Sequence, residues 1–227
     1  MRRILSILIN LFIAVVAFAA WLSMVFAVSH GGPLTAGGIF SLKFFTTLSN
    51  LFNAFVCLFY AFRLIVRWEP TPRFMTWKLA STAAVGLTFL TVTGFFGPAF
   101  GYATMYQGSN FWLHLVLPVL SILSFCTLER GVALPFRATF LALIPMLLYS
   151  VGYLGNVLIQ GVGEWPQRHD FYGFLTWGWG IGAAIVLSLV FAVWILAVIL
   201  WKLSGRKNTR SQVPTTSAER CRKSADC

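Results

Sequence analysis

The most diagnostic part of the chain is residues 181–201, IGAAIVLSLVFAVWILAVILW. This run contains no charged residue and has the roughly 20 apolar residues that a helix needs to cross a bilayer. Working outward from it, five further apolar runs are found, and together they give six predicted spans at 4–28, 44–67, 78–100, 111–128, 134–156 and 172–201. We therefore predict an all-α fold, a polytopic membrane helical bundle of about six transmembrane helices.

The composition supports this prediction. Of the 227 residues, 58% are hydrophobic and only 10% are charged, whereas soluble domains have about 25% charged residues. The four cysteines show no spacing typical of metal ligands. We expect no metal or organic cofactor.

The net charge of +11 is explained by membrane topology. Fifteen of the seventeen Lys and Arg residues fall before the first span, in alternate connecting segments, or after the last span; the exceptions are Lys43 and Arg168. Basic residues favour the cytoplasmic side of a membrane. We therefore expect both termini in the cytoplasm and no nucleic-acid partner.

Two regions are expected along the chain. Residues 1–203 form the six-helix transmembrane domain, in which the first apolar run is too long for the core of a signal peptide. Residues 204–227 are basic and polar without hydrophobic periodicity, which predicts a disordered cytoplasmic tail. Compact loops and the absence of organelle signals favour a bacterial inner membrane. The oligomeric state is left open.

Polar residues inside the predicted spans are the candidates for function, because they are rare and costly there. No Asp or Glu falls inside a predicted span, and no Lys falls in the middle of one. This argues against an ion-coupled carrier and against a retinal protein. The clearest polar feature is a stripe on the second span, where Thr46, Ser49, Asn50 and Asn53 share one helical face.

The second polar feature is His114 on the fourth span, four residues before Pro118. Proline has no N–H to bond the carbonyl of residue i−4, so we expect an irregular helix at the histidine. Thr46 and His114 are predicted at similar depth near the outer surface. A hydroxyl and an imidazole at one level form a nucleophile and general base when they meet.

Other polar residues are expected in the same outer layer, namely Thr91, Thr93, Tyr149, Tyr153 and Asn156, with His30, His169 and Asp170 in outer loops. A polar stripe in a membrane helix also has a simpler explanation, since such residues often hydrogen-bond to neighbouring helices. From spacing alone, packing and catalysis therefore both remain open for the stripe.

The same residues carry a resemblance to a known family. Phe44-Phe45-Thr46-Thr47-Leu48-Ser49-Asn50 opens the second span, Trp112-Leu113-His114-Leu115-Val116-Leu117-Pro118 opens the fourth, and Trp165-Pro166 lies in the last outer loop. Between about residues 40 and 175 this pattern resembles the androgen-induced, ADTRP-like family of multi-span membrane proteins, and more closely its bacterial integral membrane relatives.

The resemblance implies a threonine-type hydrolase of fatty-acid esters, since animal members of the family have that activity. Matched residue by residue, Lys43-Phe44-Phe45-Thr46 puts the nucleophile at Thr46 and the base at His114. Thr47 is an alternative nucleophile.

We therefore expect an integral membrane hydrolase of fatty-acyl esters, with Thr46 and His114 catalytic and Asn50, Ser49, Thr47 and Asn53 contacting the substrate. Asn50 is the candidate for orientation or oxyanion stabilisation. The expected partners are membrane lipids and a hydrophobic fatty-acyl substrate. The alternative is a non-enzymatic membrane protein with a lipid-binding, scaffolding or transport role.

Overall fold

The computed structural model describes residues 1–26, 37–163 and 169–205, and it confirms the all-α helical bundle. Six helices are long and apolar enough to span a membrane. The six spans are α1 (Arg2–Val25), α2 (Phe45–Ile65), α3 to α4 (Pro72–Phe100), α6 to α7 (Ser109–Thr127), α8 to α9 (Ala138–Gln160) and α10 (Trp179–Ser204). Of the predicted tail at 204–227, Ser204 is the last residue of α10 and residues 206–227 lie outside the described residues.

Three of the described spans are interrupted: the fifth is broken between α8 and α9, and the third and fourth contain a π-helical turn near their outer ends. The third span consists of α3 (Pro72–Thr91), a π-helical turn η2 (Val92–Phe96) and α4 (Gly97–Phe100). The fourth consists of α6 (Ser109–Phe111), a π-helical turn η3 (Trp112–Val116) and α7 (Leu117–Thr127). The remaining elements are η1 (Gly38–Lys43), α5 (Tyr102–Met105), α8 (Ala138–Leu141) and α9 (Ile144–Gln160).

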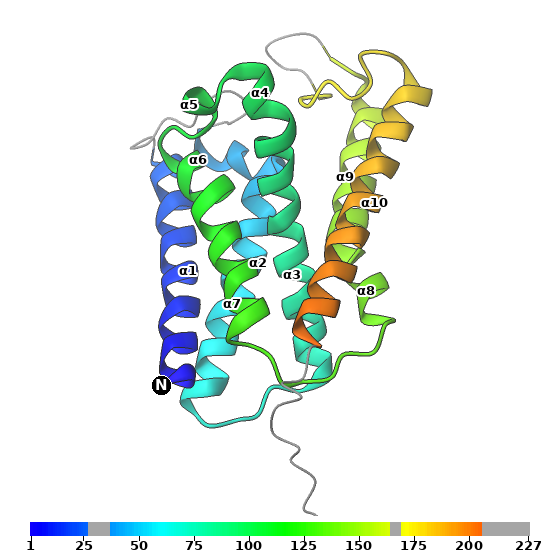
Figure 1. Ribbon diagram of the computed structural model, residues 1–227. Coiled ribbons are helices and arrows are strands. Elements are labelled where there is room, and N and C mark those ends of the chain that lie inside the picture. Colours follow the sequence, from blue (N-terminus) through cyan, green and yellow to red (C-terminus); the bar gives the residue numbers. More distant parts are fainter. Residues whose placement is uncertain (27–36, 164–168, 206–227) are drawn as a thin grey trace, which may run out of the picture.

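The start of α1 and the end of α10 lie at the same end of the bundle (Figure 1). We call this the inner end, because it carries the basic residues that predict the cytoplasmic side. The opposite, outer end holds η1, the start of α2 and the end of α9. An even number of spans brings both ends of the described chain to one side, as predicted.

α3 lies at the centre of the bundle. It is the most buried of the spans, while α10 is the least buried. Its small residues Ala80, Ala83 and Ala84 are almost completely buried and pack with residues of α7, α8 and α10 in one apolar cluster. A second cluster joins α1 to α2 and to the fourth span. Small side chains let membrane helices approach closely, so α3 is enclosed on most sides.

The third span starts earlier than predicted. Thr71 caps α3 by accepting a hydrogen bond from the Phe74 N–H at 3.3 Å, and Pro72 occupies the first turn. Lys78 is one of the fifteen basic residues counted in the sequence as lying at the inner side, between the second and third spans, and this placement in the connecting segment is wrong. It lies inside α3 and is completely buried.

Lys78 is buried because a polar cluster surrounds its ammonium group. Its Nζ donates to Asn10 Oδ1 at 2.5 Å and to Cys57 Sγ at 2.9 Å, and lies 3.6 Å from Glu129 Oε1. Glu129, just beyond α7, also accepts from Asn10 Nδ2 at 2.8 Å and from Ser124 Oγ at 2.7 Å. We call Asn10, Cys57, Lys78, Ser124 and Glu129 the inner cluster. It links α1, α2, α3 and α7.

Candidate functional site

Thr46 occupies the first turn of α2, and an outer loop fixes where this helix begins. Phe44 is extended, which ends η1 and lets α2 start at Phe45. The Phe45 N–H donates to the hydroxyl of Tyr172 at 3.0 Å. Burial raises the pKa of the Tyr172 phenol, so this partner is neutral at ordinary pH. The loop after α9 therefore holds the helix start that carries Thr46.

His114 lies in the middle of the π-helical turn η3, where the sequence predicts an irregular helix. Pro118 has no N–H to offer the His114 carbonyl, and the Leu117 N–H bonds the carbonyl of Trp112, five residues earlier. A π-helical turn changes the direction in which its side chains point and is frequent at functional sites. The local irregularity is thus explained by the sequence itself.

The Thr46 hydroxyl and the His114 imidazole are in contact. Thr46 Oγ1 lies 3.1 Å from His114 Nε2, a hydrogen-bonding distance. His114 is only 6% exposed, whereas Thr46 is partly exposed. The Thr47 side chain is also buried, but the hydroxyl at the imidazole is that of Thr46.

The other ring nitrogen of His114 determines which tautomer suits this contact. The carbonyl of Asn110, one turn earlier, faces the ring, although Nδ1 makes no hydrogen bond of normal geometry. For Nε2 to accept the hydrogen bond from Thr46, the proton of the neutral ring has to be on Nδ1. In that tautomer Nε2 has a free lone pair and accepts the hydrogen bond from Thr46.

Ser49 and Asn50 hold the main chain of Thr46. Ser49 Oγ donates to the Thr46 carbonyl at 3.1 Å. Asn50 Nδ2 donates to the same carbonyl at 2.9 Å and to the Leu113 carbonyl at 3.0 Å. Since Leu113 precedes His114, Asn50 links the two helix segments that carry the pair. Both amide hydrogens are used in this way.

Asn53 belongs to a different network, one turn deeper. Its Nδ2 donates to Ser121 Oγ at 2.7 Å, and its Oδ1 accepts from Ser81 Oγ at 3.0 Å. Cys57 Sγ also donates to Asn53 Oδ1 at 3.7 Å. Asn53 is completely buried and connects α2, α3 and α7. Within the described part of the chain it makes no hydrogen bond to Thr46 or His114, and its hydrogen bonds to neighbouring helices are those of a packing residue.

Several buried polar atoms around the pair have no hydrogen-bond partner within the described part of the chain. They are Asn50 Oδ1, His114 Nδ1, and both Nδ2 and Oδ1 of Asn110. Asn110 is 1% exposed and lies four residues before His114, on the same side of the helix. Buried polar groups are normally hydrogen-bonded, so unpaired ones indicate a place for water or a ligand.

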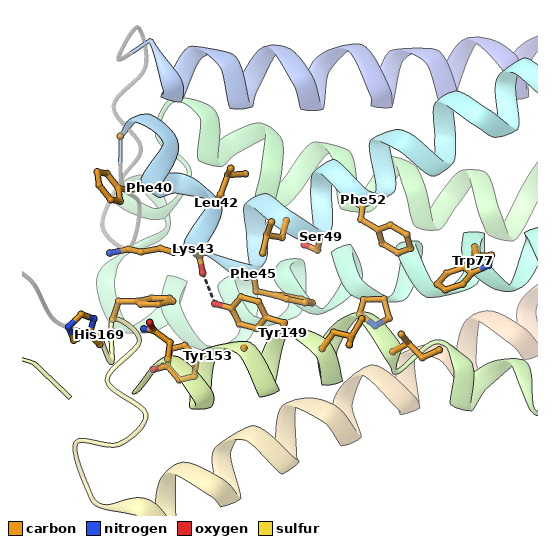
Figure 2. Close-up of a pocket in the computed structure, with 18 residues that line it drawn as sticks. Phe40, Leu42, Lys43, Phe45, Ser49, Phe52, Trp77, Tyr149, Tyr153 and His169 are labelled. Carbon is orange, nitrogen blue, oxygen red and sulfur yellow. Dashed lines mark hydrogen bonds between the residues drawn. The ribbon is translucent and has the colours of Figure 1, made fainter. Parts of the chain in front are cut away.

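A large cavity of about 1200 Å³ lies beside the pair, between α2, α3 and α9 (Figure 2). Phe45, Leu48, Ser49 and Phe52 of α2 line it, at the spacing of one helical face. Thr46 and His114 do not line it; the Thr46 stripe is the neighbouring face of the same helix. Ser49 is shared, because it lines the cavity and bonds the Thr46 carbonyl.

Tyrosines of α9 connect the cavity to the outer loops. Tyr149 donates to the Lys43 carbonyl at 2.9 Å (Figure 2), and Tyr153 donates to Asp170. The Asp170 carboxylate also accepts from the N–H groups of Phe174 and Leu175, both at 3.0 Å. Both tyrosines and Asn156 line the cavity.

The remaining candidates lie elsewhere. Thr91 donates to the Leu87 carbonyl within its own helix, and Thr93 pairs with the Tyr106 hydroxyl. His30 and Trp165-Pro166 fall outside the described residues. Among the residues that the structure describes, no three His, Cys, Asp or Glu side chains are grouped to hold a metal ion.

The fold and these contacts define an integral membrane protein with six candidate spans in its described residues and a partly buried threonine–histidine contact next to a mainly apolar cavity. No protein-family model, no curated protein and no solved structure matches the chain.

Proposed function

We propose that the protein hydrolyses a fatty-acyl ester in the membrane, with Thr46 as nucleophile and His114 as general base. The observation that carries the proposal is the 3.1 Å contact between Thr46 Oγ1 and His114 Nε2. A nucleophile and its base within hydrogen-bonding distance are the minimal requirement for this chemistry. The resemblance to threonine-type ester hydrolases gives the same two residues.

The reaction follows two steps. Thr46 Oγ attacks the acyl carbonyl while its proton passes to His114 Nε2, and the alcohol leaves with that proton as the acyl–threonine ester forms. A water molecule then gives a proton to His114 and attacks the acyl carbon. Thr46 recovers its proton as the fatty acid is released. The Asn110 carbonyl beside the ring stabilises the imidazolium formed in each step.

The oxyanion is assigned to main-chain donors. Asn50 has no amide hydrogen left for this role, because both bond carbonyls. Thr46 and Thr47 lie in the first turn of α2, where N–H groups lack a partner within the helix. The positive end of the helix dipole favours negative charge there. Asn50 and Ser49 then act as positioning residues.

The cavity supports a fatty-acyl substrate. It is lined mainly by apolar and aromatic side chains, which suit an acyl chain, and it shares Ser49 with the shell of Thr46. The polar layer at the outer end would hold the ester group. The proposal includes an orientation with the pair near the outer face of a bacterial inner membrane, in keeping with the basic inner end.

The test is hydrolysis of long-chain acyl esters by the purified protein in detergent. We expect Thr46→Ala to reduce the rate to background and His114→Ala to reduce kcat by about 10²–10⁴-fold, the usual contribution of a general base. Thr47→Ala is the matched control, because it removes the neighbouring hydroxyl, and it should retain the wild-type rate. Equal rates for wild type and Thr46→Ala would exclude the mechanism.

A second candidate function is lipid binding without catalysis. It is favoured by the fact that neither Thr46 nor His114 lines the cavity. In that case the cavity would bind lipid while the pair joins α2 to the fourth span. A folded protein that binds lipid but turns over no acyl ester would support this alternative.

A further inference from the structure

The cavity between α2, α3 and α9 changes in polarity along its length. At its outer end are Lys43, His169 and Tyr153, and at its inner end are Phe52 and Trp77 (Figure 2). Since α9 ends at the outer side, Asn156 near its end lies at the polar end of the cavity, and Ile144 and Pro145 at its start lie at the apolar end. A lipid in the outer leaflet has the same arrangement, with its headgroup at the surface and its chains toward the middle of the membrane.

The length of the cavity fits the acyl chains of one leaflet. Its lining residues on α9 run from Ile144 to Asn156, which corresponds to about 18 Å at 1.5 Å per residue. One leaflet contributes half of a hydrocarbon core that is roughly 30 Å thick. The volume of about 1200 Å³ exceeds the roughly 300–1,000 Å³ of pockets for drug-sized ligands. There is room for a lipid with two chains.

The cavity is also accessible from the membrane. Leu148 of its lining is 68% exposed and Leu48 is 40% exposed, although both are apolar. In a bilayer these side chains face lipid, so a lipid can enter sideways between α2 and α9 without crossing the polar surface.

The positive charge of Lys43 at the outer end of the cavity favours a ligand with an anionic headgroup. Lys43 Nζ lies 5.0 Å from the centre of the Phe171 ring and 5.4 Å from that of Phe44. Among the residues that the structure describes, no acidic side chain lines the cavity. Asp170, next to His169, is completely buried, and its carboxylate accepts hydrogen bonds from Tyr153 and two backbone N–H groups. Within the described part of the chain, no lining carboxylate therefore neutralises the Lys43 ammonium group. Lysine commonly binds phosphate as a point charge.

We propose that this cavity is a binding site for an anionic phospholipid of the outer leaflet, with its acyl chains between α2 and α9 and its phosphate at Lys43 and His169. The proposal concerns binding and is independent of hydrolysis at Thr46. It specifies a lipid with an anionic headgroup and two acyl chains, whereas the proposed function requires only a fatty-acyl ester.

Glycines of α9 provide a matched pair of variants. Gly152 lines the cavity, while Gly155 on the same helix does not. At both positions an added Cβ meets no atom within 4 Å. Gly152→Phe should therefore put an aromatic ring into the cavity where the acyl chains would lie, and Gly155→Phe should add the same side chain outside it. Neither position requires a positive φ.

The experiment is native mass spectrometry of the purified full chain with phosphatidylglycerol, phosphatidylcholine or oleate added separately at equal concentration. We expect phosphatidylglycerol to bind most tightly, Gly152→Phe to abolish its binding, and Gly155→Phe to leave it unchanged. Lys43→Gln should weaken phosphatidylglycerol about fivefold, the effect of one lysine near a charged headgroup, while Lys202→Gln at the inner end should not.

Three results would overturn the proposal. Equal affinity for phosphatidylglycerol and phosphatidylcholine would show that headgroup charge does not determine binding. Preferred binding of oleate would show that the site takes a single-chain fatty acid and not a phospholipid. Full binding by Gly152→Phe would put the lipid outside the cavity. Thr46→Ala must bind like wild type, so loss of hydrolysis and loss of binding are separate outcomes.

Discussion

The protein has two buried polar centres with opposite character, one at each end of the bundle. At the outer end, Thr46 and His114 share one contact, and atoms of Asn50, Asn110 and His114 around them lack partners among the described residues. At the inner end, the Lys78 ammonium is in contact with three side-chain acceptors, and Lys78 and Glu129 have no exposed side-chain surface. Glu129 Oε2 also lacks a hydrogen-bond partner there, but Lys78 compensates the charge of its carboxylate. The outer centre lies next to the large cavity, whereas the inner cluster does not line this cavity and joins four helices.

The difference also bears on transport. The sequence places no acidic residue inside a predicted span, yet Glu129 is buried beside Lys78. Neither residue lines the large cavity, and the charges of the pair compensate each other. The inner cluster is therefore best explained as a clamp between α1, α2, α3 and α7.

The largest expected effect is on stability, from breaking the inner cluster. Lys78→Met leaves Glu129 buried without its cation, and removing one partner of a buried ion pair costs about 3–5 kcal/mol. Chemical denaturation in detergent measures the loss. Lys202→Met, at an exposed lysine of α10, is the control and should change stability by less than about 0.5 kcal/mol.

A double variant tests whether the loss of stability comes from an uncompensated buried charge. Lys78→Met combined with Glu129→Leu removes both charges, so no uncompensated ion is left in the bundle. It should be more stable than Lys78→Met alone, because an apolar pair of similar volume often replaces a buried ion pair at little cost. A double variant that loses the sum of the single effects would show that the two residues act independently.

A smaller effect is expected at Asn53. Asn53→Leu leaves the Ser81 and Ser121 hydroxyls without their shared partner, and an unsatisfied buried polar group costs about 1–3 kcal/mol. The contact between Thr46 and His114 is not touched. On the proposed function, the rate of ester hydrolysis per folded molecule should therefore remain at the wild-type value, measured after the folded fraction has been determined.

Asn50→Leu is compared with Asn53→Leu, because it should lower the rate of hydrolysis as well as the stability. It removes the hydrogen bonds to the Thr46 and Leu113 carbonyls, so the two segments that carry the pair lose their link. We expect about 1 kcal/mol of destabilisation per net hydrogen bond and a fall in kcat at unchanged KM. If Asn53→Leu lowered kcat more than Asn50→Leu, the separation between positioning and packing residues would be wrong.

The smallest effect is expected at Tyr172. Tyr172→Phe removes the acceptor of the Phe45 N–H at the start of α2, a net loss of about 0.5–1.5 kcal/mol. The melting temperature should fall by a few degrees. Tyr106→Phe, in the connection between the third and fourth spans, is the comparison, because it removes a hydroxyl that pairs with Thr93 and not with the start of α2.

The six spans and the irregular helix at His114 could be predicted because they depend on local properties, namely apolar length and the missing N–H of Pro118. The contact between Thr46 and His114 fits the expected equal depth of two parallel-running spans. Lys78 was misplaced because its burial depends on Asn10 and Glu129, which are distant in sequence. The cavity was not predicted, since its walls come from α2, α3 and α9 together.

The most direct test of the threonine–histidine pair is covalent labelling with a fluorophosphonate probe, with the modified residue found by peptide mass spectrometry. We predict labelling at Thr46 in wild type and Thr47→Ala, and its loss in Thr46→Ala and His114→Ala, because the probe reacts only with an activated hydroxyl. A well-folded wild type that takes up no label, or labelling that persists in Thr46→Ala, would contradict the assignment of Thr46 as the nucleophile.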